Sequence, residues 1–177
     1  MANEIVNGVD LEKLPQPILA EHSEWVALYH FAWRLAAQHI RELRGRRYMD
    51  AAWDPDRNFQ WVWDTCFMTL YGRYGGGQYP GGPSLDNFYD LQRSDGYISM
   101  TYDMTAGQEP WPDRINPPLF AWAEWEYYRT TGDASRFARV VPHIEKLMAW
   151  IDAHRRTQPH RRLRAEDNST DGRGDSA

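Results

Sequence analysis

The chain has 177 residues, enough for one domain of ordinary size with a buried core. Its net charge of -5 argues against a nucleic-acid-binding protein, because such proteins neutralise phosphates with clustered Lys and Arg. Aromatic residues make up 14% of the chain, and side chains of this kind build either a helical core or a pocket for flat ligand faces. Composition alone leaves both interpretations open.

Cellular location is predicted from cysteine usage and from the N-terminus. The single Cys66 cannot form an internal disulfide, which is typical of a reducing compartment. The first residues lack a basic segment followed by an apolar core, and no stretch reaches the ~18 consecutive apolar residues of a membrane span. The sequence therefore predicts a cytoplasmic protein with no membrane partner, and it makes no prediction of oligomeric state.

The predicted elements are mostly helical. Residues 1–22 carry Pro15 and Pro17 without hydrophobic periodicity and are interpreted as an N-terminal arm. From Ser23 to Arg44 apolar residues recur every three or four positions, which predicts a helix that Gly45 closes. Further helices are predicted at 64–74, 84–92, 118–131 and 135–156, the last divided at Pro142, with an extended segment at 97–104.

The end of the chain has a different composition. Residues 157–177 contain no aromatic and almost no apolar side chain, so burial cannot offset their chain entropy and they are predicted to be disordered. The change after Arg156 is abrupt, which suggests that the chain is truncated or read out of frame at that point. The predicted organisation is an arm at 1–22, a helical part at 23–156 and a tail at 157–177.

Several familiar chemistries are not supported by the motifs present. Asp54 and Asp56 imitate the opening of a calcium loop, but Phe59 stands where that loop requires glycine. The six histidines have no metal-binding spacing, and Cys66 has no adjacent base that would activate it. We therefore expect no metal, no cofactor and no Ser or Cys nucleophile.

Asp64 stands directly after two tryptophans, Trp61 and Trp63, in the segment FQWVWDTCF. An aspartate at the start of a helix is commonly an N-cap that contributes about 1 kcal/mol. Aromatic faces beside a carboxylate are also how proteins hold sugars, by stacking on the ring and accepting hydrogen bonds from its hydroxyls. Both interpretations of Asp64 are open at the level of sequence.

Five segments together resemble the (α/α)6 toroid glycosidases, in particular glycoside hydrolase family 63 and the mannosylglycerate hydrolase-like domain. The resemblance depends on their order and spacing and covers residues 23–155. It implies an all-α fold, a toroid of helical hairpins joined by long irregular loops, of which this chain holds only an incomplete barrel. The segments are 59–67, 96–98, 116–123, 131–133 and 141–150.

The resemblance also implies a function, the inverting hydrolysis of an α-linked glucoside or mannoside. Carried over by position, Trp63, Asp64 and Thr65 would bind the sugar that is cleaved, with Phe59 as a nearby wall. We add Trp61 to this predicted substrate-binding set because of its place beside them. Asn116 joins the set as well, although the family commonly has glutamine before its Pro-Pro pair.

The catalytic residues themselves are not found. An inverting glycosidase needs an acid and a base about 6.5–9.5 Å apart, and the resemblance places both beyond the matched region. The prediction is therefore an N-terminal fragment that holds sugar-binding residues without the catalytic pair, so that the chain alone is inactive. One alternative is a complete, non-catalytic helical protein that binds a carbohydrate or a partner. Another is a toroid with lyase or epimerase chemistry.

Overall fold

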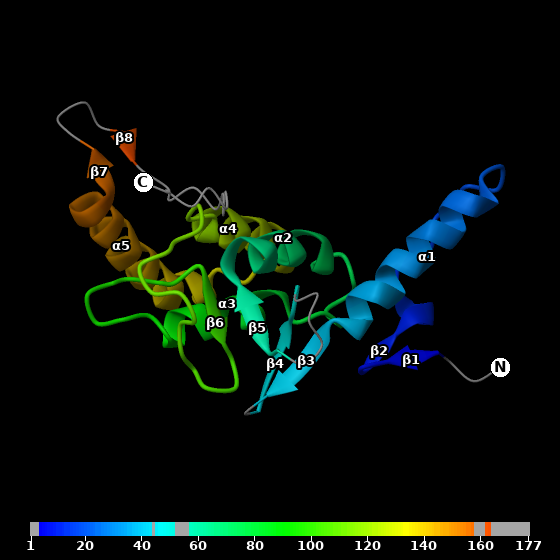
Figure 1. Cartoon of the computed structure of the whole chain (residues 1–177). Helices are drawn as coiled ribbons and strands as arrows, with labels where there is room; N and C mark the ends of the chain where they lie inside the picture. The colour runs from blue at the N-terminus through cyan, green and yellow to red at the C-terminus, as the bar shows by residue number, and fades with distance from the viewer. Residues whose placement is uncertain (1–3, 44, 52–56, 158–161, 164–177) are drawn as a thin grey trace, which may run out of the picture.

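The structure is a computed structural model that describes residues 4–43, 45–51, 57–157 and 162–163 (Figure 1). Within these residues it has five α-helices, one 3-10 turn and eight short strands. The helices are α1 (Ser23–Gln38), α2 (Val62–Gly72), α3 (Gly81–Asp90), α4 (Phe120–Thr131) and α5 (Ser135–Arg155), and the 3-10 turn is η1 (Leu11–Lys13). The strands are β1 (Ile5–Val6), β2 (Val9–Asp10), β3 (Ile40–Leu43), β4 (Arg46–Met49), β5 (Phe59–Trp61), β6 (Thr101–Asp103), β7 (Arg156–Thr157) and β8 (Arg162–Leu163).

The molecule has a helical body and a projecting arm. Helices α2 to α5 form the body, while α1 extends away from it with the β1–β2 hairpin at its side (Figure 1). The strands pair as four two-stranded antiparallel sheets, β1 with β2, β3 with β4, β5 with β6 and β7 with β8. No described helix has the length and apolar character needed to cross a bilayer.

The predicted all-α fold is wrong, because small antiparallel sheets join and flank the helices. The clearest difference lies at the end of the first predicted helix, where Ile40–Leu43 pairs with Arg46–Met49. Apolar residues at positions 40 and 43 are three apart and continue the helical period, so periodicity favoured a helix where the chain forms a strand. Gly45 has φ +72°, and this left-handed conformation makes the hairpin turn and not a helix cap.

The β5–β6 hairpin places the start of α2. Phe59 lies opposite Asp103 and Trp61 opposite Thr101 in the antiparallel register. The Val62 N–H donates to the Met100 carbonyl at 2.9 Å, which continues the pairing up to the first residue of the helix. Because α2 begins at Val62, Trp61 occupies the N-cap position, and the N-cap interpretation of Asp64 is wrong.

The C-terminal helices follow their predicted signals closely. Gly132 ends α4 with φ 72°, the predicted left-handed cap, and Asp133 accepts a hydrogen bond from the Ser135 N–H at 3.0 Å at the start of α5. The predicted division at Pro142 is wrong, because α5 runs unbroken from Ser135 to Arg155. Both Pro142 and Ala138 lie on the exposed side of α5, where water can satisfy the carbonyl that proline leaves unbonded.

Two apolar clusters hold the fold together. The larger lies among α2 to α5 and includes Leu85, Phe88 and Phe120, all buried. The smaller joins α1 to the N-terminal hairpin and to the loop after α2, where the Tyr79 hydroxyl donates to the Trp33 carbonyl at 2.9 Å. Helix α2 contributes to both clusters, with Cys66 in the larger and Met68 in the smaller.

Two sequence-based predictions fall mainly outside the described residues. The predicted disordered tail at 157–177 is described only where Thr157 pairs with Arg162 in the β7–β8 hairpin. Positions 54 and 56 of the calcium-like loop also lie outside.

Candidate functional site

The candidate site lies where β5 passes into α2. Side chains alternate along a strand, so Phe59 and Trp61 share one face of β5. Trp111, from the loop before α4, covers both of them, with ring centroids 5.8 Å from Phe59 and 5.5 Å from Trp61. We call these three residues the aromatic cluster, and each of them is partly exposed.

Gln60, on the opposite face of β5, anchors this strand to the body. Its side-chain amide donates to the Ser84 carbonyl at 2.7 Å and accepts from the Asn87 amide at 2.8 Å, and it is fully buried. A polar network in which the bonds are made holds its members in one geometry. The aromatic cluster is therefore supported from behind by hydrogen bonds to α3.

Trp63 and Asp64 lie in the first turn of α2. Trp63 is 40% exposed, and its ring lies 6.3 Å from that of Phe67, one turn further along the helix. Asp64 is half-buried, and desolvation by burial raises the pKa of its carboxyl, while hydrogen bonds from its own backbone N–H and the Trp63 side chain oppose the rise. Asp64 is therefore a partly desolvated acceptor beside an accessible indole.

Thr65, another predicted sugar-binding residue, points inward. It is fully buried, and its hydroxyl donates to the Trp61 carbonyl at 2.7 Å and accepts from the Gln60 amide at 3.4 Å. These bonds fix the junction between β5 and α2. The structure places Thr65 behind the site, where it orients its neighbours.

Asn116, the last predicted residue, is only 5% exposed, and neither its amide oxygen nor its amide nitrogen has a hydrogen-bond partner among the described residues. Its loop is connected to the start of α2, because the Met100 N–H donates to the Arg114 carbonyl and the Met100 carbonyl accepts from the Val62 N–H, each at 2.9 Å. A buried amide without partners costs about 1–3 kcal/mol and calls for a specific explanation, such as a bound polar molecule.

Sequence reasoning missed Trp111 as a member of the site. Glu109, two residues before Trp111, forms an ion pair with Arg93 at 2.6 Å. The pairing of β5 with β6 positions the loop that carries Trp111. The segment around Trp111 does not by itself predict that pairing. Asp103 on β6 accepts from the Thr105 N–H at 2.8 Å and so holds the turn after the strand.

The acids around Trp125 serve the fold. Glu124 is buried and takes a two-bond ion pair from Arg136, at 2.6 and 2.8 Å, together with a hydrogen bond from the Tyr89 hydroxyl at 2.9 Å. Glu126 pairs with Arg73 across α2 and α4. Both carboxylates are engaged by arginine side chains within the fold, so neither is available as an acceptor for a ligand.

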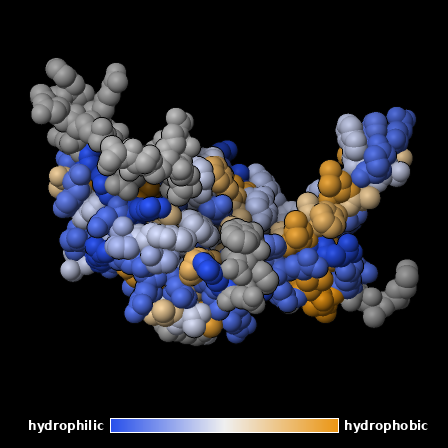
Figure 2. All heavy atoms as spheres, in the orientation of Figure 1, coloured by the Kyte–Doolittle hydropathy of each residue, from blue (hydrophilic) through white to orange (hydrophobic). Residues whose placement is uncertain are grey.

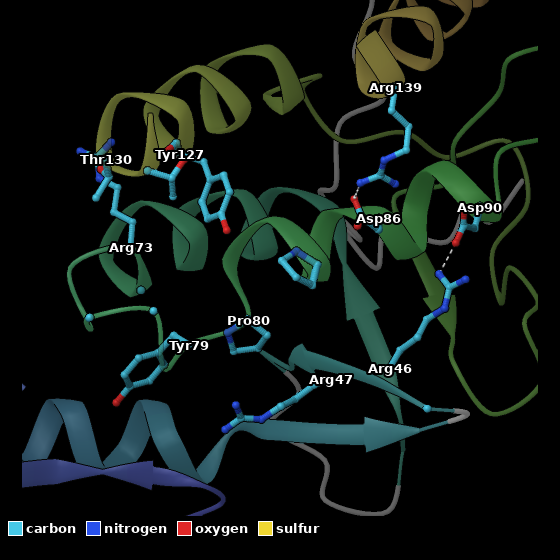
Figure 3. A pocket seen from close by; sticks show the side chains of 16 residues that line it. Arg46, Arg47, Arg73, Tyr79, Pro80, Asp86, Asp90, Tyr127, Thr130 and Arg139 are labelled. Atoms are coloured by element: carbon cyan, nitrogen blue, oxygen red, sulfur yellow. Dashed lines mark hydrogen bonds and ion pairs between the residues drawn. The ribbon is translucent and has the colours of Figure 1, made fainter. Parts of the chain in front are cut away.

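A hollow of about 790 Å³ opens on another face, between β4, the loop after α2, and helices α3 and α4 (Figure 3). Four arginines line it, and each is directed to a different partner. Arg139 pairs with Asp86 at 2.7 Å, and Arg47 donates to the Gln78 carbonyl at 3.1 Å. Arg46 pairs with Asp90 and Arg73 with Glu126. The guanidinium groups therefore do not converge on a common anion.

Metal and thiol chemistry receive no support from the part of the chain that the structure describes. No group of three or more His, Cys, Asp or Glu side chains there is arranged to hold a metal ion. Cys66 is fully buried in α2, and burial raises the pKa of its thiol well above the ordinary value.

Comparison with known proteins finds a relative that matches part of the chain. Over 92 residues the chain is 32% identical to an uncharacterized protein of Borreliella burgdorferi, and the match covers 50% of this chain and 19% of that protein. The chain therefore spans about a fifth of the length of the relative it matches. No protein-family model matches the chain, and no solved structure matches it.

These findings overturn the predicted membership of the (α/α)6 toroid glycosidases. No model of such a family matches, the relative carries no assigned activity, and the chain has paired strands between its helices where the toroid is wholly helical. The short segments that carried the resemblance are aromatic helix faces and turns, which unrelated folds also use. The site at the start of α2 must be judged from its own geometry.

Proposed function

We propose that the N-terminal end of α2 binds a carbohydrate, and that this chain supplies the sugar-holding part of a glycoside hydrolase acting on an α-linked glucoside or mannoside. The proposal rests on the local chemistry of the site and not on a family. Three features support it: an accessible aromatic wall, a half-buried carboxylate, and a buried amide without partners.

The aromatic wall suits the C–H face of a sugar ring. The rings of Trp61 and Trp111 pack against each other with a tilt of 33°, and both residues remain partly exposed. Trp63, in the first turn of α2 and 40% exposed, adds a third indole. Large, rigid aromatic faces bind ring faces with little loss of side-chain entropy.

Asp64 supplies the acceptor that sugar recognition needs. A carboxylate in a partly desolvated position makes stronger hydrogen bonds than one in water, because the surrounding dielectric is lower. Its place in the first turn of α2 also favours the charged form, since the helix N-terminus carries partial positive charge. It is therefore suited to accept hydrogen bonds from two neighbouring hydroxyl groups.

The observation that carries the proposal is Asn116. An amide offers donors and an acceptor together, which is the combination that complements a sugar hydroxyl. In the unliganded chain both ends of this amide are buried and unpaired among the described residues. A bound sugar hydroxyl would form hydrogen bonds with both groups, and these bonds would offset the free-energy cost of burying the amide unpaired.

We expect no hydrolysis by this chain alone. Cleavage with inversion requires a second carboxyl across the sugar from the first. Two acids on and after β6 are committed elsewhere, Glu109 to Arg93 and Asp103 to the turn after β6. The relative extends far beyond the matched region, and we propose that the catalytic pair belongs to such additional sequence.

The test is a titration of the chain with α-linked mannose and glucose disaccharides, in which binding is measured by calorimetry and by tryptophan fluorescence. We expect saturable binding by the natural chain and a loss of at least tenfold in affinity for Asn116→Leu, about 1.4 kcal/mol. Asp95→Asn, at an exposed turn remote from α2, is the control that should bind normally. Absence of binding by the natural chain, or unchanged affinity in Asn116→Leu, would refute the proposal.

A further inference from the structure

Helix α1 is apolar on two faces, and only one of them is covered. Trp33 and Ala37 are buried against the N-terminal hairpin and the loop after α2. A second row faces solvent, in which Trp25 is 58%, Leu28 65% and Leu35 42% exposed. An apolar face of a helix is normally buried against another layer of the protein or of a partner. One layer is present in the described chain.

The exposed row has the spacing of a helix-packing seam. Trp25, Leu28, Ala32 and Leu35 follow one another at intervals of three, four and three residues, so they align along one side of α1. In Figure 2 apolar residues are visible along this helix where it leaves the body. The seam therefore presents side chains that fit the surface of another helix.

The seam borders an apolar groove of about 460 Å³ between α1 and α2. Ala32, Leu35 and Ala36 form one wall, and Met68 and Tyr71 form the other. Trp33 lies between them, with its ring 6.3 Å from that of Tyr71. Grooves of this kind receive the apolar face of an amphipathic helix, whose anchors recur at three- and four-residue intervals.

We propose that this face is the interface of a homodimer, in which α1 of a second copy lies antiparallel along α1 and over the groove. The same helix supplies both a wall of the groove and a row of apolar anchors. In two copies related by a two-fold axis, the anchors of each copy can therefore pack into the groove of the other. Helix α1 projects from the body, and this position leaves it accessible to a second copy (Figure 1).

The antiparallel direction follows from side-chain size and the helix dipoles. With the axis midway along the seam, Leu28 of one copy faces Ala32 of the other, a large residue against a small one. Antiparallel pairing also opposes the two helix dipoles.

The exposed apolar area is of the right size for a stable dimer. Apart from Trp63, six large apolar side chains on α1 and α2 are 40% or more exposed: Trp25, Leu28, Phe31, Leu35, Phe67 and Tyr71. Burial of these side chains, together with the smaller residues between them, is what an interface of about 800 Å² per partner, the standard size, requires. This inference is independent of the sugar proposal, because the seam and groove lie along α1 and the later turns of α2.

Sedimentation equilibrium and light scattering of the chain test the dimer. We expect a dimer whose dissociation constant rises at least 100-fold in the double variant Leu28→Glu with Leu35→Glu. The control Ala27→Glu adds one charge on the polar side of the same helix and should leave the dimer intact. A natural chain that is monomeric up to roughly 1 mM, or an assembly that the double variant does not weaken, overturns the proposal.

Cross-linking tests the direction and remains informative if the charged variant fails to fold. In a Cys66→Ser background, Leu28→Cys with Ala32→Cys should form disulfide-linked dimers on mild oxidation, because the two positions face each other across the axis. Ala27→Cys in the same background should give no cross-linked species on the same non-reducing gel. A soluble dimer in which the 28/32 pair does not cross-link overturns the antiparallel arrangement.

Discussion

The two ends of helix α2 are both rich in aromatic side chains, yet they present different chemistry. At its N-terminal end, Trp61 and Trp63 stand beside the half-buried Asp64 and near the loop of the unpaired Asn116. At its C-terminal end, Met68 and Tyr71 line a groove whose walls are almost wholly apolar. A sugar needs a flat face together with hydrogen-bonding groups, whereas a helix needs only an apolar groove of suitable width.

A stripe along α2 connects the two ends. Trp63, Phe67 and Tyr71 follow one another at intervals of four residues and therefore lie on one side of the helix. Trp122 of α4 packs edge-on against Phe67 at 5.9 Å, in the middle of the stripe. Aromatic content alone thus does not distinguish the two ends. The polar groups beside the rings decide which ligand each end is suited to bind.

The largest effect on the sugar site is expected from Asp64→Ala. Hydrogen bonds to a charged acceptor contribute about 1.5–3 kcal/mol, so affinity for an α-linked disaccharide should fall by about 10- to 100-fold. Calorimetric titration measures this loss, and Glu145→Ala on the exposed side of α5 is the matched control. If Asp64→Ala lowered the melting temperature while the folded protein bound sugar normally, the role of Asp64 would be structural.

Two buried asparagines offer a comparison of stability within one molecule. Asn87 is bonded to Gln60 and Arg46, so Asn87→Leu leaves partners unsatisfied and should lower the free energy of unfolding by about 1–3 kcal/mol. Asn116→Leu removes an amide that has no described partner, and the free energy of unfolding should stay equal or rise. Urea denaturation measures both. Equal destabilisation by the two changes would contradict the account of Asn116.

Trp111 is expected to have a smaller effect, confined to the N-terminal end of α2. Trp111→Ala removes the ring that covers Phe59 and Trp61, and a contact of this type contributes about 0.5–1.5 kcal/mol. Sugar affinity should fall up to about tenfold, while the dimer proposed at α1 should be unaffected. Trp25→Ala should show the opposite pattern. Loss of both properties in either variant would show that the two ends are not separate sites.

The smallest expected effect is the pH dependence of Asp64. Burial raises the pKa of this carboxyl, so the folded protein holds its proton more strongly than the unfolded chain does. Its contribution to stability therefore falls as the pH rises from the ordinary value of 3.8 through the raised pKa, and it stays constant above. In Asp64→Asn this fall should be absent from the melting temperature measured against pH. An identical profile in the two proteins would count against the raised pKa.

Sugar binding should depend on the same titration in the opposite sense. The carboxylate form of Asp64 is the hydrogen-bond acceptor, so affinity should decrease as the pH is lowered through the raised pKa. Titrations at successive pH values, with Asp64→Asn as the reference, separate this effect from general acid unfolding. Affinity that rises on acidification would mean that the protonated form is the one that binds.

The helices were largely predictable because their signals are local. The three- and four-residue periodicity of α1 and the glycine that ends α4 are written in short stretches of sequence. The strands were less predictable. β3, β5 and β6 have only three or four residues each, and their extended conformation depends mainly on hydrogen bonds to a partner strand. Two of these short strands, β5 and β6, determine where α2 begins.

The site shows the same division between local and tertiary information. Trp63 and Asp64 were proposed from one short segment in which aromatic and acidic residues are adjacent. Trp111 escaped notice because it joins Phe59 and Trp61 only through the pairing of β5 with β6. Thr65 was expected at the sugar, but the helix rotates it into the interior, where its hydroxyl bonds to the Trp61 carbonyl. A start of α2 two residues later would have directed these side chains differently.

The most direct test of the sugar site at the start of α2 is an NMR titration of the nitrogen-15-labelled chain with an α-linked mannose or glucose disaccharide. The indole N–H signals of Trp61, Trp63 and Trp111 should shift and saturate together, while those of Trp25 and Trp150 stay in place. Shifts confined to Trp25 or Trp33, or no indole shift at saturating sugar, would contradict the account.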